Sequence, residues 1–320
     1  MKRVDYVSAS WLALAIAVTV WLGLDRAGTR ASVPVQREKL AAEARLAQLP
    51  NGERGVIDAN GVVVPIRNYQ RIATISTPAD TIALALLEPE RLIAMSDYGK
   101  GHSETPYLYG ARMTVYGPKH LEELVQQRVD LLLINHLGSA ADLARVREAG
   151  IQVFNLGDMR GMTTLLPNIA AFAALIGAPE RGEAYASKLV RRMRAVAADI
   201  APARRKTAIY VSSYANQLFG GADGTSYHDV LTSAGLRDLA AERGFSGWTH
   251  FDPEQLVELD PELIVAHDGT GELLCRVGGL AVLRACKHGG VIEMQMDLLS
   301  DPGPRMLEAA EVLRERVYKH

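Results

Sequence analysis

One segment of the chain occurs twice with the same design. Residues 121–135 read LEELVQQRVDLLLIN, and residues 253–267 read PEQLVELDPELIVAH. In each copy a short amphipathic helix begins with an acidic residue, Glu122 or Glu254, and leads directly into an apolar strand. A repeat separated by 132 residues is too long for a solenoid unit. The repeat therefore predicts two similar α/β lobes, each with a glutamate at the same place.

Strand and helix patterns alternate along the rest of the chain, after an expected β-hairpin at 55–66. Apolar strands are expected at 71–76, 91–96, 130–135, 152–156, 206–212, 263–267 and 290–293. Helical segments between them predict parallel sheets with helices on both faces. Residues 180–200 predict one long helix of roughly 30 Å. The expected fold class is α/β: two Rossmann-like lobes at 55–178 and 203–320, bridged by a connecting helix at 179–202.

The N-terminus has the pattern of a targeting or anchoring segment. Two basic residues precede an apolar run of 14 residues, Trp11–Leu24. This length is typical of a signal peptide and short for a spanning helix of ~20 residues. An uncleaved anchor is the alternative, because Val4–Leu24 approaches spanning length. We expect a signal peptide or membrane anchor at 1–31, a helical spacer at 32–54, and the body of the chain outside the cytoplasm.

The net charge and the spacing of the two cysteines argue against two kinds of binding, to nucleic acid and to zinc. The net charge of −2 does not favour non-specific nucleic-acid binding, which requires a basic excess. Cys275 and Cys286 fit no zinc-binding spacing. Spacing alone does not establish a disulfide. Two reduced thiols are the preferred interpretation, and a disulfide is the alternative in an exported protein.

Sequence signatures of common enzyme classes are missing. The chain contains no GxSxG, GxxxxGK[ST] or HExxH motif. Their absence favours a binding protein over an enzyme. The alternative is a membrane-anchored enzyme or sensor that uses the same two lobes. An enzyme would need a cluster of titratable side chains such as His136, His250, His267 and Asp268.

Several segments, in this order and spacing, resemble one protein family. They are DANGVVVP, RIATISTPADTIALALLEPERLIAMS, the two glutamate–helix–strand units, REAGIQVFNL, GGLAVLRACKHGGVIEM and PGPRMLEAAEVL. From about Gly55 to the C-terminus the chain resembles the periplasmic substrate-binding proteins of ABC importers for iron–siderophore complexes, haem and cobalamin. It departs from many relatives in lacking a lipid-anchor cysteine near the N-terminus.

The resemblance implies a non-enzymatic function. A ferric siderophore, haem or cobalamin would bind in a cleft between the lobes, and the monomeric protein would deliver it to ABC permease subunits. The protein would be periplasmic or extracytoplasmic, with tethering to the inner membrane if the N-terminal segment is retained. By position in the motif, Glu122 and Glu254 would dock onto the permease; alternatively, each is only a first-turn helix acid that the helix dipole stabilises.

Candidate ligand contacts follow from the rule that open α/β sheets bind ligands beyond the carboxyl ends of their strands. The side chains expected there are Tyr98, His102, Tyr107, His136, Arg160, Tyr214, Trp248, His250 and His267. Aromatic side chains provide flat apolar walls for a macrocycle. Tyr98 and His102 are the candidates for haem ligation, with a solvated loop as the alternative. His136 and His267 either face each other across the cleft or each bond a neighbouring loop.

Overall fold

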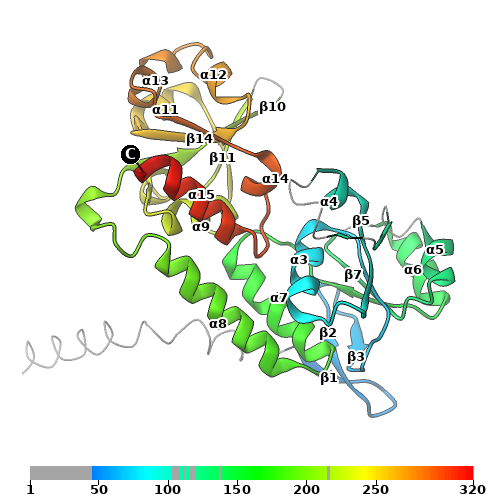
Figure 1. Cartoon of the computed structure of the whole chain (residues 1–320). Helices are drawn as coiled ribbons and strands as arrows, with labels where there is room; N and C mark the ends of the chain where they lie inside the picture. The colour runs from blue at the N-terminus through cyan, green and yellow to red at the C-terminus, as the bar shows by residue number, and fades with distance from the viewer. Residues whose placement is uncertain are drawn as a thin grey trace, which may run out of the picture.

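The computed structural model describes residues 45–102, 109–110, 112–115, 120–136, 138–214 and 217–319. The predicted signal or anchor segment at 1–31 and most of the predicted spacer at 32–54 lie outside these residues. Among the described helices, none is long and apolar enough to cross a lipid bilayer. The described chain forms an α/β structure of two lobes, each with one parallel sheet (Figure 1).

Five parallel strands form the sheet of the first lobe, in the order β6-β5-β4-β7-β8. In that order their bounds are Met113–Val115, Leu92–Ser96, Ile72–Thr74, Leu131–Ile134 and Gln152–Asn155. Every residue of β7 is buried, which explains its unbroken apolar sequence, because helices cover both faces of a parallel sheet. After β4 the chain adds β5 and β6 on one side of the sheet, and it then adds β7 and β8 on the other side of β4. The carboxyl ends of β4 and β7 therefore form a topological switch point.

Helices and a small antiparallel sheet complete the first lobe. The helices are α3 Thr77–Leu86, α4 Asp97–His102, α5 Leu121–Gln126, α6 Ala140–Glu148 and α7 Met162–Leu175. The antiparallel sheet has the order β1-β2-β3, with bounds Leu46–Gln48, Arg54–Ile57 and Val63–Pro65. The predicted hairpin is confirmed by the pairing of β2 with β3.

The predicted spacer helix is wrong at its C-terminal end. Residues 46–48 form β1 and pair with β2 instead of continuing a helix. Leu46 packs against the main apolar core, which a spacer helix would not allow. The first lobe thus begins before residue 55.

Two sheets form the second lobe. The parallel sheet has the order β12-β9-β14-β15, with bounds Arg237–Asp238, Thr207–Tyr210, Leu263–His267 and Val291–Met294. An antiparallel sheet, which the sequence did not predict, has the order β10-β11-β13, with bounds Ser212–Tyr214, Gln217–Gly221 and Trp248–Phe251. The helices are α9 Ser226–Ser233, α10 Leu239–Glu242, α11 Pro253–Leu259, α12 Gly271–Leu274, α13 Arg284–Lys287, α14 Met296–Leu299 and α15 Met306–Tyr318, with 3₁₀ turns η3 Pro202–Arg204 and η4 Leu280–Val282.

The sequence repeat is also a structural repeat. Its first copy forms α5 and β7, and its second copy forms α11 and β14. Leu124 and Leu256 are both fully buried at matching positions. Just after each helix lies a matching non-glycine residue with positive φ, Arg128 at 52° and Asp260 at 39°. The two lobes therefore share a helix, a turn and a buried strand of the same design.

The acid that precedes the strand in each copy has one structural role. The Asp130 carboxylate accepts hydrogen bonds from the backbone N–H groups of Gln70 (2.7 Å) and Arg71 (3.0 Å), just before β4. The Glu262 carboxylate accepts from the N–H (2.8 Å) and hydroxyl (3.0 Å) of Thr207, the first residue of β9. In each lobe the acid thus fixes the start of the neighbouring parallel strand.

The connecting helix α8, Pro179–Ala195, is shorter than predicted. It ends at Ala195 instead of continuing to residue 200. The turns that follow place the buried side chains of Ala197 and Ile200 beside Gly235 at the end of α9. Packing of these two apolar side chains against the second lobe explains the earlier end of the helix.

The buried face of α8 belongs to an apolar core that both lobes share. Ala186, Leu189 and Met193 lie in one cluster with Phe172 of α7 and with Leu313 of α15. Figure 1 shows α8 beside α7 and running toward the second lobe. A continuous core of this kind resists a free hinge between the lobes, because relative motion would expose packed apolar surface.

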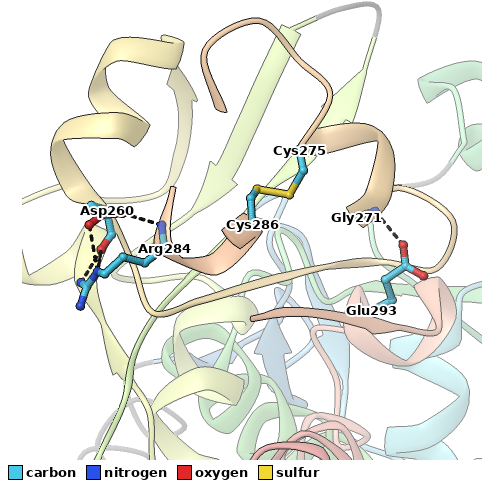
Figure 2. Close-up of a disulfide and its surroundings, with 6 residues drawn as sticks. All are labelled: Asp260, Gly271, Cys275, Arg284, Cys286 and Glu293. Atoms are coloured by element: carbon cyan, nitrogen blue, oxygen red, sulfur yellow. Dashed lines mark hydrogen bonds and ion pairs between the residues drawn. A yellow bond between two sulfur atoms is a disulfide. The ribbon is translucent and has the colours of Figure 1, made fainter. Parts of the chain in front are cut away.

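Cys275 and Cys286 form a disulfide, so the preferred interpretation of two reduced thiols was wrong (Figure 2). The bond joins the end of α12 to α13. The chain between the cysteines turns back and brings their Cα atoms to 5.7 Å, within the range that a disulfide spans. The sequence spacing alone contained no information about this approach.

We expect Asp130→Ala to lower the free energy of unfolding by about 1–3 kcal/mol, because two backbone donors at the start of β4 would lose their partner. Chemical denaturation measures the change. The matched control is Glu258→Ala, which removes an exposed acid from α11. Equal stability of the two variants would contradict the role assigned to Asp130.

Candidate functional site

An aromatic cluster lies at the carboxyl end of β9 in the second lobe. The ring of Tyr210, the last residue of β9, stacks on Tyr227 of α9 with centroids 3.6 Å apart. Trp248, the first residue of β13, meets both rings edge-on, at 5.2 Å from Tyr227 and 6.3 Å from Tyr210. Tyr210 and Tyr227 are buried, whereas Trp248 is 59% exposed. The cluster therefore supports one large apolar surface that faces solvent.

His267 extends this cluster to the end of β14. Its Nε2 lies 3.2 Å from the Tyr210 hydroxyl and 2.9 Å from Ser300 Oγ, and Tyr227 also donates to Ser300. Burial lowers the pKa of His267, although Asp268 opposes the shift. Of the two alternatives, local bonding thus describes the His267 ring. The His136 ring is exposed, and its position opposite His267 stays a prediction.

The first lobe presents Tyr98 near the end of β5. Tyr98 lies in α4 and is 54% exposed. The Gly99 N–H donates to Ser96 Oγ, which holds the start of α4 against the strand end. The side chain of His102 and all of Tyr107 lie outside the described residues, so the haem-ligand prediction for Tyr98 and His102 stays a prediction.

The remaining candidates are divided between the two lobes. Arg160 forms an exposed ion pair with Asp158 at 2.9 Å, which competes with a ligand carboxylate for its guanidinium. His250 meets Phe219 edge-on at 5.5 Å and is half-exposed on β13. The backbone of Tyr214 ends β10, but its side chain is not among those described. Of the nine predicted contacts, the structure thus brings Trp248 and His267 into one cluster.

Sequence reasoning missed Tyr210, Tyr227 and Ser300. The signal for Tyr210 was present, because it ends a predicted strand. The predicted strand runs to residue 212, so the rule that ligands bind beyond strand ends selects Tyr214 instead of Tyr210. Tyr227 and Ser300 reach the cluster from α9 and from the end of α14. Their approach depends on tertiary packing, which strand-end positions do not predict.

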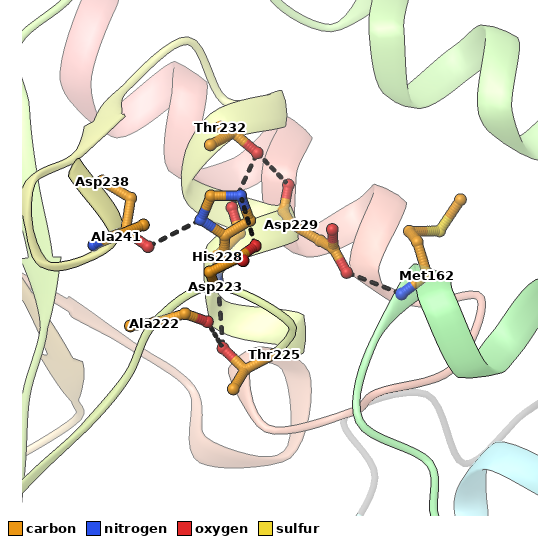
Figure 3. Close-up of polar contacts among 9 residues, drawn as sticks. All are labelled: Met162, Ala222, Asp223, Thr225, His228, Asp229, Thr232, Asp238 and Ala241. Carbon is orange, nitrogen blue, oxygen red and sulfur yellow. Dashed lines mark hydrogen bonds and ion pairs between the residues drawn. The ribbon is translucent and has the colours of Figure 1, made fainter. Parts of the chain in front are cut away.

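A polar contact joins the two lobes at the start of α7 (Figure 3). Asp229 of α9 accepts a hydrogen bond from Met162 N at 2.7 Å. A Cβ atom at Gly161 would lie 2.4 Å from that carboxylate and 2.9 Å from Ser226 N, so only glycine fits there. His228, also on α9, donates a hydrogen bond from Nδ1 to the Asp238 carboxylate at 2.8 Å, and this bond raises the pKa of His228. The hydrogen bond between Met162 N and Asp229 fixes α9, and with it Tyr227, against the first lobe.

Two hollows of the second lobe lie away from the aromatic cluster. One, of 370 Å³, opens at the amino ends of β14 and β15 and includes Lys206, Glu262, Arg284, His288 and Arg316 in its lining. The other, of 550 Å³, lies beside the disulfide. The first hollow lies at the wrong end of the sheet, because ligands of open α/β sheets bind at the carboxyl ends of the strands. None of the predicted ligand contacts lines the second hollow. The aromatic cluster is therefore the better candidate site despite these volumes.

Across the described residues, no group of three or more histidine, cysteine, aspartate or glutamate side chains is arranged to hold a metal ion.

Known proteins similar to this chain include two curated relatives. An uncharacterized ABC transporter substrate-binding lipoprotein, YvrC from Bacillus subtilis, is 25% identical over 62% of this chain, and the match spans 65% of that relative, just under two thirds of its length. A vitamin B12-binding protein from Salmonella choleraesuis is 23% identical over 76% of this chain and 88% of its own length.

Solved structures share the fold. The periplasmic heme-binding protein RhuT from Roseiflexus sp. RS-1, in apo form, superposes with a TM-score of 0.62 at 19% identity and covers 78% of this chain and 98% of its own. The family model described as periplasmic binding protein matches residues 72–298, which is more than half of the chain. This chain belongs to the periplasmic binding protein family.

Proposed function

We propose that this protein is the extracytoplasmic solute-binding component of an ABC importer and that it delivers a metal chelate of the cobalamin, haem or ferric-siderophore class. The observation that carries the proposal is the exposed face of Trp248, supported by the Tyr210–Tyr227 stack at the carboxyl end of β9. A rigid aromatic surface at a strand end suits a flat, largely apolar macrocycle.

The comparisons support this ligand class without selecting one member. One curated relative is named for vitamin B12 binding, and several structural neighbours are named for haem binding. Binding without catalysis is part of the proposal; the His267 ring is buried and forms hydrogen bonds with Tyr210 and Ser300 within its own lobe. The ligand would lie between Trp248 and the Tyr98 end of the first lobe.

We propose that Glu122 and Glu254 dock the protein onto cationic side chains of the permease. Both residues are exposed, and each lies in the first turn of its helix, α5 or α11. The helix dipole stabilises a carboxylate at this position. One acid on each lobe would set the orientation and association rate of the complex more than its affinity.

Tryptophan fluorescence tests the ligand class. The chain has three tryptophans, Trp11, Trp21 and Trp248, so the variant Trp11→Phe/Trp21→Phe reports on Trp248 alone. We expect micromolar cyanocobalamin, haemin or a ferric siderophore to quench this signal, after correction for absorbance with free N-acetyltryptophanamide. Trp248→Ala should weaken binding about tenfold or more, as measured by equilibrium dialysis. Failure of all three chelates to quench would contradict the proposed ligand class.

Charge reversal tests docking. The double variant Glu122→Lys/Glu254→Lys should abolish uptake in a host strain that lacks the native copy, because each lysine would repel a cationic partner. The matched control, Glu123→Lys/Glu258→Lys, reverses exposed acids on the same two helices and should retain uptake. Ligand affinity in dialysis should be unchanged in both. Equal uptake by the two double variants, or lost ligand affinity in the first, would refute docking through Glu122 and Glu254.

A further inference from the structure

Asp301 is a buried acid with an incomplete set of hydrogen bonds. It lies between α14 and α15 and is 4% exposed. Its Oδ1 accepts a hydrogen bond from Gly303 N at 2.7 Å. Its Oδ2 is buried and has no hydrogen-bond partner among the described residues. An ionised carboxylate in this position would leave a desolvated charge, which is costly.

A second buried acid, Asp80, lies in α3 of the first lobe and is fully buried. In contrast to Asp301, it accepts four hydrogen bonds. The donors are the Thr74 hydroxyl, Ser96 N (3.1 Å), the Ser96 hydroxyl and the Tyr109 hydroxyl (3.1 Å). Burial raises the pKa of Asp80 to about 6 in spite of these donors. The number of donors, four on Asp80 and one on Asp301, is what favours the charged form of Asp80 relative to that of Asp301.

Asp301 lies where the segment after α14 packs on the start of α3, the helix that carries Asp80. A Cβ atom at Gly303 would lie 2.7 Å from Asp301 Oδ1, 3.1 Å from Thr81 Oγ1 and 3.2 Å from Pro78 Cα. Burial raises the pKa of Asp301 to about 6; the Gly303 hydrogen bond and Arg305 oppose the shift, and the charges of Asp80 and Glu308 add to it. Burial likewise raises the pKa of Asp80.

Other charged and titratable groups face Asp301 without neutralising it. Arg305 is buried at the start of α15, but its Nε donates to Glu308 at 3.2 Å. The Tyr109 hydroxyl is bonded to Asp80, and Tyr185 reaches the junction from α8. The pKa values of both tyrosines are raised, chiefly by burial, so both stay neutral. Arg305 therefore offsets the charge of Asp301 only in part, and a proton on Asp301 removes the rest.

We propose that Asp80 and Asp301 form a proton-binding site at the lobe junction, with the proton on Asp301, and that loss of this proton loosens the junction and weakens chelate binding. The last clause rests on the proposed function. Each acid is linked to one side of the candidate site. Asp80 holds Ser96, whose hydroxyl accepts from Gly99 beside Tyr98. Asp301 follows Ser300, which contacts His267 and Tyr227.

The direction of the pH effect follows from the raised pKa. The folded protein binds the Asp301 proton more tightly than the unfolded chain, in which an aspartate has its ordinary value of 3.8. The stability that this proton contributes is therefore fully present below pH 3.8 and is lost as the pH rises through about 6. Between pH 5 and pH 8 the junction should weaken.

Thermal unfolding of the full chain tests the proton site. Asp301→Asn keeps the acceptor for Gly303 N and removes the charge, so it should raise the unfolding midpoint at pH 8 more than at pH 5, by roughly 2–4 °C or more. The control Glu258→Gln removes an exposed charge and should change the midpoint equally at both pH values. An equal effect of Asp301→Asn at pH 5 and pH 8 would overturn the proposal.

A second measurement tests the proton site if the Asp301→Asn variant does not fold. In the wild-type protein labelled with ¹³Cγ-aspartate and with its resonances assigned, NMR should show that the Asp301 carboxyl titrates near pH 6. Titration of Asp301 near 3.8, with or without an Asp80 carboxyl that titrates near 6, would overturn the proposal. Dialysis with cyanocobalamin and haemin at pH 5 and pH 8 tests the coupling: we expect weaker binding at pH 8 in the wild type and a smaller change in Asp301→Asn. Binding that is equal at both pH values overturns the coupling. Absence of binding at every pH overturns the proposed function, whereas the unfolding midpoints still decide the proton site.

Discussion

Apolar packing of α8 against both lobes is the constraint on which the rest of the structure depends. Ala186, Leu189 and Met193 of this helix lie in a core that reaches from α7 to α15. The hydrogen bond from Met162 N to Asp229 reinforces the same junction, as does the close packing of Gly303 against Thr81. Because the lobes are held at fixed positions, a ligand site built from both can be formed before the ligand arrives, which reduces the ordering cost of binding.

The sequence predicted most of the fold because the repeated segment encodes its structure locally. Burial of Leu124 and Leu256 follows from helical periodicity, and the fully buried β7 and β14 follow from unbroken apolar runs. The antiparallel β10-β11-β13 sheet was not predicted, although β10 and β11 form a local hairpin; only the pairing of β11 with β13 depends on contacts distant in sequence. The pairing of Cys275 with Cys286 was not predicted either, because it depends on how α12 and α13 approach each other.

The candidate site was predicted less completely than the fold. His267 was found by its position at the end of a strand, whereas Trp248 proved to begin β13; the structure joins the two through Tyr210. Tyr227 and Ser300 lie on other elements, so no pattern near the strands could indicate them. The buried acids Asp80 and Asp301 gave no sequence signal, because an aspartate in a helix or loop is usually exposed and only packing buries it. The side chains that matter most for the site are thus those that tertiary contacts bring to the strand ends.

A crystal structure of the protein with its bound chelate tests the central claim most directly. We expect one face of the ligand to lie on the exposed ring of Trp248, with its opposite edge within contact distance of Tyr98 in α4. Ligand density confined to the hollow at the amino ends of β14 and β15, or to the hollow beside the disulfide, would contradict the account.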